Sequence, residues 1–165
     1  MTADARTATE TATPTDTETV AAAAVGADPE SLSDDALLGA FEAAAFAPGS
    51  FHHRHHVRVA WACLERAPIL EVLPRFAAGL RRLATAAGQP GLYHETITWA
   101  YVLLVNERRA PAGTEDWNAF AERNPDLLAW KPSVLEQRYY NEDTLWSDRA
   151  RARFVMPDRG DRRMA

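Results

Sequence analysis

The segment from Tyr93 to Arg108 is apolar on nearly every face of a helix, and it constrains the fold more than any other part of the chain. Its large apolar residues are Ile97, Trp99, Tyr101, Val102, Leu103, Leu104 and Val105. A helix that is hydrophobic all round is buried, because it has no polar face to turn toward water. We therefore expect residues 93–108 to form the central element of the domain.

Other segments place apolar residues at intervals of three and four, the spacing of one helical face. The helices expected from this spacing and from turn residues cover residues 31–46, 50–68, 73–87, 114–120, 125–135 and 147–154. Ser50 is expected to cap the second helix, and Gly88 to end the third in a left-handed conformation. Because no alternating strand pattern of useful length occurs, the predicted fold is all-α. It is a single-domain helical bundle of about four main helices plus short C-terminal helices.

The chain of 165 residues has room for one domain with a real core. Residues 1–30 differ from the rest, with eight threonines in the first twenty positions. Such a segment buries too little apolar surface to offset its ordering entropy, so we expect a disordered Thr/Ala-rich tail. The expected helical domain covers residues 31–158, followed by a frayed basic C-terminus at 159–165.

Charge and cysteine content exclude several classes of partner. The net charge is −5, and the only basic cluster lies near the C-terminus, so a nucleic-acid partner is not expected. No apolar stretch is long enough to span a bilayer, which argues against a membrane protein. The single cysteine, Cys63, fits a reducing cytoplasm and is expected to be an inert core residue. We expect a cytoplasmic protein that acts on a small molecule; its oligomeric state stays open.

Four of the five histidines fall within residues 52–56, and the fifth is His94. On a helix, residues three apart are neighbours, which divides the cluster into two pairs. His53 and His56 continue into the apolar stripe of the second helix, so both rings should point inward. His52 and His55 belong to a less apolar stripe and are expected at its rim.

A metal centre is the sharper hypothesis for these residues, because imidazole is the commonest metal ligand. His53, His56 and His94 could be joined by a carboxylate from Glu95 or Glu42, giving a ligand set that suits Fe, Cu or Zn. Two histidines with one carboxylate would leave positions open for substrate and oxygen. Three histidines would suit zinc that activates a water, with Glu95 as the catalytic general base.

A plainer interpretation of the same residues stands beside this hypothesis. The histidine-rich pentapeptide could be solvated surface, and the ring of His94 could simply bond a carbonyl in the core. Glu95 could serve only as the negative residue of a first helical turn. Arg138, Tyr139 and Tyr93 are candidates for binding substrate; for Arg138 and Tyr139 the alternative is a surface turn with aromatic anchors.

Two motifs, Phe51-x-His53-x-x-His56 and Tyr93-His94-Glu95-Thr96-x-Thr98, resemble those of a family of small uncharacterised bacterial proteins. The resemblance covers about residues 34–158. It implies that the family's histidines fall on His53 and His56, and that His52 and His55 are additions of this sequence. It implies no particular reaction.

Two functions fit these observations. The first is a transition-metal-dependent enzyme that acts on a small organic metabolite, with a biosynthetic pathway as one setting and Fe, Cu or Zn as its cofactor. Its reaction is left open between oxidative chemistry at Fe or Cu and hydrolysis or lysis at Zn. The second is a non-catalytic helical protein that binds a small molecule or a metal.

Overall fold

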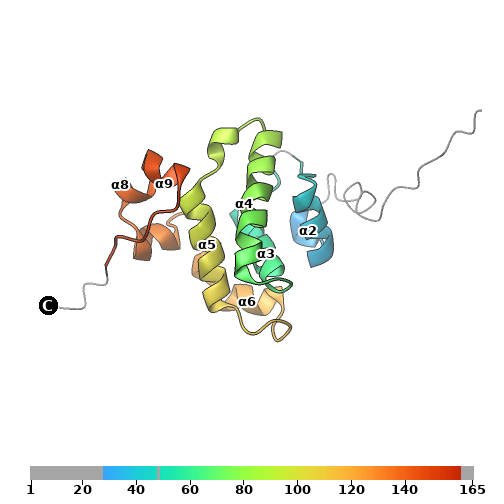
Figure 1. Cartoon of the computed structure of the whole chain (residues 1–165). Helices are drawn as coiled ribbons and strands as arrows, with labels where there is room; N and C mark the ends of the chain where they lie inside the picture. Colours follow the sequence, from blue (N-terminus) through green and yellow to red (C-terminus); the bar gives the residue numbers. More distant parts are fainter. Residues whose placement is uncertain (1–27, 48, 161–165) are drawn as a thin grey trace, which may run out of the picture.

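The computed structural model describes residues 28–47 and 49–160, and this part of the chain contains helices and no strand (Figure 1). Its four main helices are α2 (Asp34–Glu42), α3 (His53–Leu64), α4 (Ile69–Ala86) and α5 (Glu95–Arg108). Its shorter elements are η1 (Pro29–Ser31), η2 (Pro90–Leu92), α6 (Trp117–Arg123), α7 (Pro125–Leu128), the π-helix η3 (Leu135–Tyr139), α8 (Glu142–Leu145) and α9 (Asp148–Ala152). The predicted all-α fold is confirmed.

Helix α5 lies at the centre of the bundle, as its apolar sequence predicts. It packs against α3, α4 and α9, while α2 lies on the far side of α3 and α4 from α9 (Figure 1). Val102 and Val105 of α5 are completely buried. Each large aliphatic side chain removed from water in this way stabilises the fold by roughly 1.5–3 kcal/mol. Among the described residues, no helix combines the length and the apolar character needed to cross a bilayer.

Helix α3 begins later than expected, and the prediction that Ser50 caps it is wrong. The Ser50 hydroxyl donates to the carbonyl of Ala47 at 2.8 Å, which uses it in the preceding turn. His52 is the N-cap instead, and its backbone N–H donates to Nδ1 of His55 at 2.9 Å. The histidine-rich segment therefore supplies its own helix start, because an imidazole nitrogen can satisfy a backbone N–H near a helix terminus.

Helix α4 starts four residues before the expected boundary and contains Pro74. Proline in a helix interior leaves the carbonyl four residues earlier without a partner. Here that carbonyl belongs to Leu70, whose residue is 82% exposed, so water can bind it. The predicted end of the helix is confirmed: Gly88 has φ of 69°, and Gln89 N–H donates to the Ala84 carbonyl at 2.8 Å.

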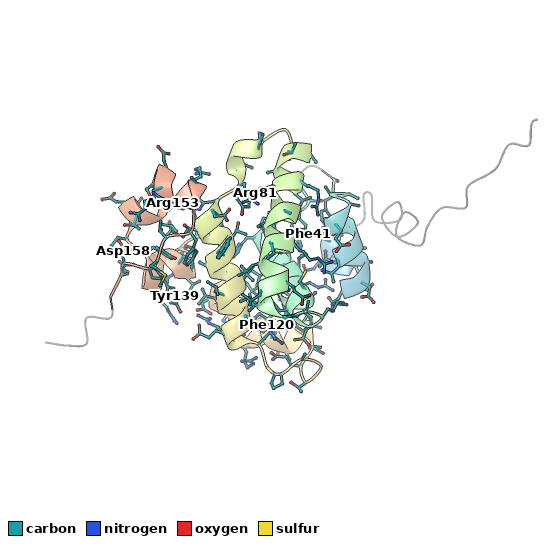
Figure 2. The ribbon with its side chains drawn as sticks, viewed as in Figure 1. Phe41, Arg81, Phe120, Tyr139, Arg153 and Asp158 are labelled. Atoms are coloured by element: carbon teal, nitrogen blue, oxygen red, sulfur yellow. The ribbon has the colours of Figure 1, made fainter. Side chains whose placement is uncertain are left out.

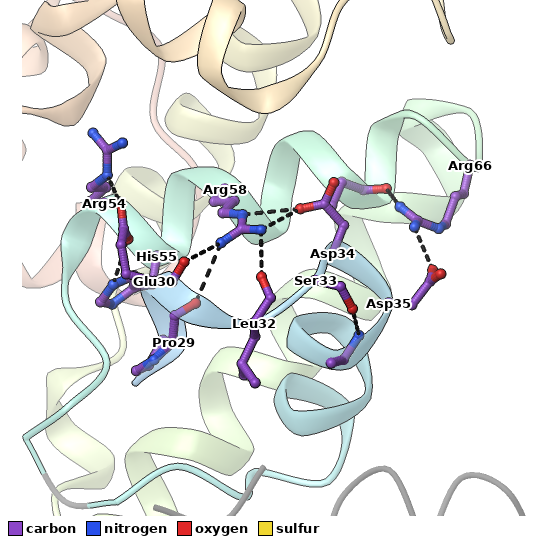
Figure 3. A network of polar contacts seen from close by, with 12 residues as sticks. Pro29, Glu30, Leu32, Ser33, Asp34, Asp35, Arg54, His55, Arg58 and Arg66 are labelled. Carbon is purple, nitrogen blue, oxygen red and sulfur yellow. Dashed lines mark hydrogen bonds and ion pairs between the residues drawn. The ribbon is translucent and has the colours of Figure 1, made fainter. Parts of the chain in front are cut away.

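The N-terminal end of the described chain is held by the guanidinium of Arg58, which is only 8% exposed (Figure 3). Arg58 donates to Asp34 Oδ1 at 2.8 Å and to the carbonyl of Leu32 at 2.7 Å. It also reaches the carbonyls of Pro29 and Glu30, both at 3.4 Å. The folded part of the chain thus includes residues 28–30, which the sequence assigned to the tail. Residues 1–27 of that tail lie outside the described residues.

The C-terminal segment is held against α5 by Thr96. Its hydroxyl donates to the carbonyl of Arg153 at 2.9 Å and accepts the N–H of Val155 at 3.1 Å. Tyr140 adds a third bond by donating its hydroxyl to the Val155 carbonyl at 2.9 Å. Arg159, within the expected frayed end, donates its N–H to the Tyr139 carbonyl at 3.0 Å. Residues 161–165 lie outside the described residues.

Candidate functional site

A cavity of about 460 Å³ lies between α3, α4 and α5, beneath the segment that joins α2 to α3. This volume falls within the range of roughly 300–1,000 Å³ that is typical of small-molecule sites. Most of its lining is apolar, including Phe46, Phe51, Val57, Phe76, Leu80, Leu83 and Ile97. Leu92, Trp130 and Trp146 also line it and are 67%, 43% and 38% exposed, so they mark the rim where the cavity meets solvent.

Three of the five histidines line this cavity: His53, His56 and His94. The first two come from one face of α3, as the helical phase predicts, and His94 is the N-cap of α5. The fold thus brings to one cavity three histidines that the sequence indicates as site residues. Their ring nitrogens, however, differ in what they already bind.

Both ring nitrogens of His94 are occupied by the backbone. Nδ1 accepts the N–H of Ile97 at 3.3 Å, and Nε2 lies 2.9 Å from the carbonyl of Leu145. A carbonyl only accepts, so Nε2 carries the proton and the ring is neutral. Burial lowers the pKa of His94, which favours the same neutral form. The plainer interpretation of His94, a core histidine that bonds a carbonyl, describes this geometry.

His53 is held in a similar way by one of its two nitrogens. Its Nε2 donates to the carbonyl of Leu127 at 2.8 Å, and its ring packs edge-on against Tyr101 with centroids 4.7 Å apart. The indole of Trp130 is tilted against the same imidazole, with ring centroids 5.2 Å apart. Burial lowers the pKa of His53. Nδ1 makes no hydrogen bond within the described residues.

His56 is the cavity histidine whose two ring nitrogens are both available to a ligand. Neither of its ring nitrogens makes a hydrogen bond to a described residue, although the ring packs against Phe51 with centroids 4.7 Å apart. Burial, helped by the neighbouring imidazoles of His53 and His55, lowers the pKa of His56 to about 3. At neutral pH the ring is therefore uncharged and offers one donor and one acceptor beside an apolar cavity.

His55 does not lie at the rim, where the sequence placed it, but is 6% exposed. Its Nδ1 accepts the N–H of His52, and its Nε2 lies 3.1 Å from Oε2 of Glu30 (Figure 3). Because Nδ1 accepts, Nε2 carries the proton and donates to the carboxylate. His55 thus links α3 to η1, while His52 is exposed.

The two carboxylates considered as metal ligands lie apart from His56. Glu42 is exposed on α2, where it pairs with Arg75 at 3.0 Å and borders a second cavity that also contains Cys63. Burial raises the pKa of the Cys63 thiol to about 11, which fits the expected inert cysteine. Glu95 accepts from the Tyr93 hydroxyl at 2.7 Å and from Arg81 at 2.6 Å.

Within the described residues, no three His, Cys, Asp or Glu side chains form a group that could hold a metal ion. The metal centre and the general-base role of Glu95 stay predictions. Of the expected substrate residues, Tyr93 lines the cavity, whereas neither Arg138 nor Tyr139 does. Arg138 instead lies 3.8 Å from Asp126 with its side chain 62% exposed.

Arg151 is a cavity residue that sequence reasoning missed. Its Nη1 donates to the carbonyls of Gly91 and Tyr93, at 2.9 and 3.4 Å, and the side chain lines the cavity. In the sequence it is one of several arginines near the C-terminus and carries no signal of its own. Trp130 and Trp146 were expected only as general core or lining residues.

Comparisons of the chain with models of protein families, with curated proteins and with solved structures find no match. The resemblance to a family of small bacterial proteins therefore stays a prediction. What the fold and the site define is a class: an all-α protein with a largely apolar cavity bordered by histidines.

Proposed function

We propose that this protein binds a small, largely apolar organic molecule in the cavity between α3, α4 and α5. The observation that carries the proposal is His56, whose neutral ring borders an apolar cavity without a hydrogen-bond partner among the described residues. A polar group beside apolar walls fixes the orientation of a ligand, and this combination is the usual composition of a small-molecule site.

The aromatic lining indicates the shape of the ligand. Phe51, Phe76, Trp130 and the ring of Tyr101 surround the cavity with flat surfaces that favour an aromatic or alicyclic body. One hydroxyl, carbonyl or amine on that body would meet His56. A hydrogen bond of this kind contributes about 1 kcal/mol, or roughly fivefold in affinity.

The test uses N-phenyl-1-naphthylamine, an uncharged dye that fluoresces in apolar sites. We expect saturable binding at one site in the wild-type protein and none in Ala84→Trp, where an indole fills the cavity from α4. Thr85→Trp is the matched control, because Thr85 is the exposed neighbour and does not line the cavity. Dye binding that survives in Ala84→Trp would overturn the proposal.

The role of His56 is tested by competition against the dye. We expect 1-naphthol to displace it about fivefold better than naphthalene, since only the naphthol carries a group for the imidazole. His56→Phe should remove that preference while naphthalene binding remains. An unchanged preference in His56→Phe would show that the hydroxyl binds elsewhere.

A transition-metal-dependent enzyme is the second proposal, and it is favoured by the shared cavity of His53 and His56. Nδ1 of His53 and the ring of His56 would act as two donors for Fe, Cu or Zn, next to the bound metabolite. Elemental analysis of protein purified without a histidine tag tests it, with His52→Ala as the matched control. Bound metal should be lost in His53→Ala and His56→Ala alone; equal metal content in all three would refute it.

A further inference from the structure

We propose that the ligand of this cavity is an acid, whose anionic group is bound by Arg151 while its apolar body lies against α4. This inference rests on the proposed function and specifies the class of ligand. Arg151 comes from α9, which packs on α5, and its side chain reaches the same cavity as His56 of α3. Helices α3 and α9 lie on different sides of α5 (Figure 1), so the two residues reach the cavity from separate elements.

Arg151 has no carboxylate partner among the described residues, unlike Arg81, which lies against the cavity residue Tyr93. Arg81 pairs with Glu95 at 2.6 Å and stacks over the ring of Tyr93 at 4.3 Å (Figure 2 labels Arg81 on α4). Arg151 makes no ion pair with any residue in ranges 28–47 and 49–160. Its positive charge is thus left for a ligand.

The guanidinium of Arg151 is also held in a fixed orientation. Its Nη1 is bound by the carbonyls of Gly91 and Tyr93, and this leaves Nη2 and Nε without described partners. A planar guanidinium whose other donors remain available matches the two oxygens of a carboxylate. Because two backbone carbonyls already fix the side chain, little conformational entropy is lost when an anion binds.

The surroundings of Arg151 favour a monoanion with an apolar body over a free inorganic ion. Trp146 and Leu92 lie at the rim of the same cavity, and Leu83 and Ala84 continue the lining along α4. The indole N–H of Trp146 already donates to Glu136 at 3.1 Å, so its ring offers mainly apolar surface. An inorganic anion would leave this surface in contact with water, whereas an organic acid covers it.

Three ligands with one aromatic body test the proposal: naphthalene, 1-naphthol and 1-naphthoate, each as a competitor of the dye at neutral pH. In the wild-type protein we expect 1-naphthoate to bind about tenfold more tightly than 1-naphthol, because a charged hydrogen-bonded pair contributes roughly 1.5–3 kcal/mol. Arg151→Gln should reduce this ratio to about one, and Arg151→Lys should retain part of it.

Arg149→Gln is the matched control, since Arg149 is an exposed arginine of the same helix and does not line the cavity. It should leave the ratio unchanged. Equal binding of the acid and the alcohol in the wild-type protein, or a ratio retained in Arg151→Gln, would overturn the inference. With either of these two results, binding of 1-naphthol would still show that the cavity is folded. If 1-naphthol does not bind the wild-type protein, or if it still binds Ala84→Trp, the proposed function itself is refuted.

Discussion

The ring of Phe41 on α2 lies directly over Gly79 on α4, so that a Cβ at Gly79 would come within 2.3 Å of its Cε1 atom. Phe41 also stacks on Phe76, with ring centroids 5.4 Å apart, and Figure 2 shows it between the two helices. Glycine inside a helix costs about 1 kcal/mol relative to alanine. Here that cost is offset, because only glycine lets α2 approach α4 this closely.

Gly79→Ala should therefore lower stability, against the usual effect of such a change. Either the Phe41 ring moves or α2 shifts, and overpacking of this kind costs about 1–3 kcal/mol. The free energy of unfolding in urea measures it. Gly91→Ala is the control, because a Cβ there meets no atom within 4 Å. A Gly79→Ala variant as stable as the wild-type protein would show that α2 does not depend on this contact.

Replacing Arg58 should be among the most damaging single changes in the chain. Arg58→Met would leave Asp34 and several partly buried carbonyls without their donor. Removing one partner of a fully buried pair costs about 3–5 kcal/mol, and we expect about 2–3 kcal/mol here because the Asp34 side chain is 30% exposed. Arg54→Met is the matched control, since its pair with Glu30 is exposed and contributes below about 1 kcal/mol. Comparable losses in both variants would contradict the role assigned to Arg58.

Stability should fall as the pH drops below about 6.5, through four histidines that are buried or half-buried. Burial lowers the pKa of His53, His55, His56 and His94 in the folded protein. The unfolded chain therefore binds protons that the folded chain does not, and the stabilisation present above the unfolded pKa is lost as pH decreases. Each such group contributes up to about 1.4 kcal/mol per pH unit.

His56→Phe isolates one of these groups. Between roughly pH 6 and pH 5, where carboxylates titrate little, the variant should lose stability less steeply than the wild-type protein, by about 1.2 kcal/mol per pH unit. Urea unfolding at several pH values measures both slopes. Identical slopes would mean that the ring of His56 takes up a proton as readily in the folded protein as in the unfolded chain.

Two substitutions separate the two bonds of His94. His94→Ala loses the helix cap to Ile97 and the bond to the Leu145 carbonyl, and should cost about 2 kcal/mol. His94→Asn keeps a capping oxygen for Ile97 and should cost about half as much. Equal losses in the two variants would indicate that His94 does not act as a cap.

The helices themselves could be predicted from the sequence, because apolar residues spaced three and four apart mark a buried helical face within a short stretch of chain. Their boundaries could not always be predicted. Helix α2 ends at Glu42 rather than near Phe46, since Ala44 adopts a left-handed conformation with φ of 51°. Left-handed backbone costs alanine about 1–2 kcal/mol, which is why the sequence gives no signal for it. The conformation closes the helix with a bond from the N–H of Ala45 to the carbonyl of Ala40 at 2.9 Å.

For the site, helical phase predicts that His53 and His56 point inward, and both line the cavity, but it misplaces His55. Its burial depends on Glu30, which comes from a segment that reads as part of a polar tail. Arg151 was missed for a related reason: its carbonyl partners, Gly91 and Tyr93, are far from it in the sequence. Spacing on one helix cannot reveal a partner that the fold supplies from another.

The hydrogen bonds that Arg58 makes to the chain before α2 limit which sequence changes that segment can accept. The acceptors supplied by Pro29, Glu30 and Leu32 are backbone carbonyls, which every amino acid possesses. Other side chains at these positions would therefore leave the bonds to Arg58 in place, although replacing Glu30 would remove the carboxylate that binds Arg54 and His55. Adding or removing one residue between Pro29 and Asp34 would instead move the carbonyls relative to Asp34, and the guanidinium could no longer bind both. The bonds made by Arg58 thus depend on the length of this segment rather than on the side chains that it carries.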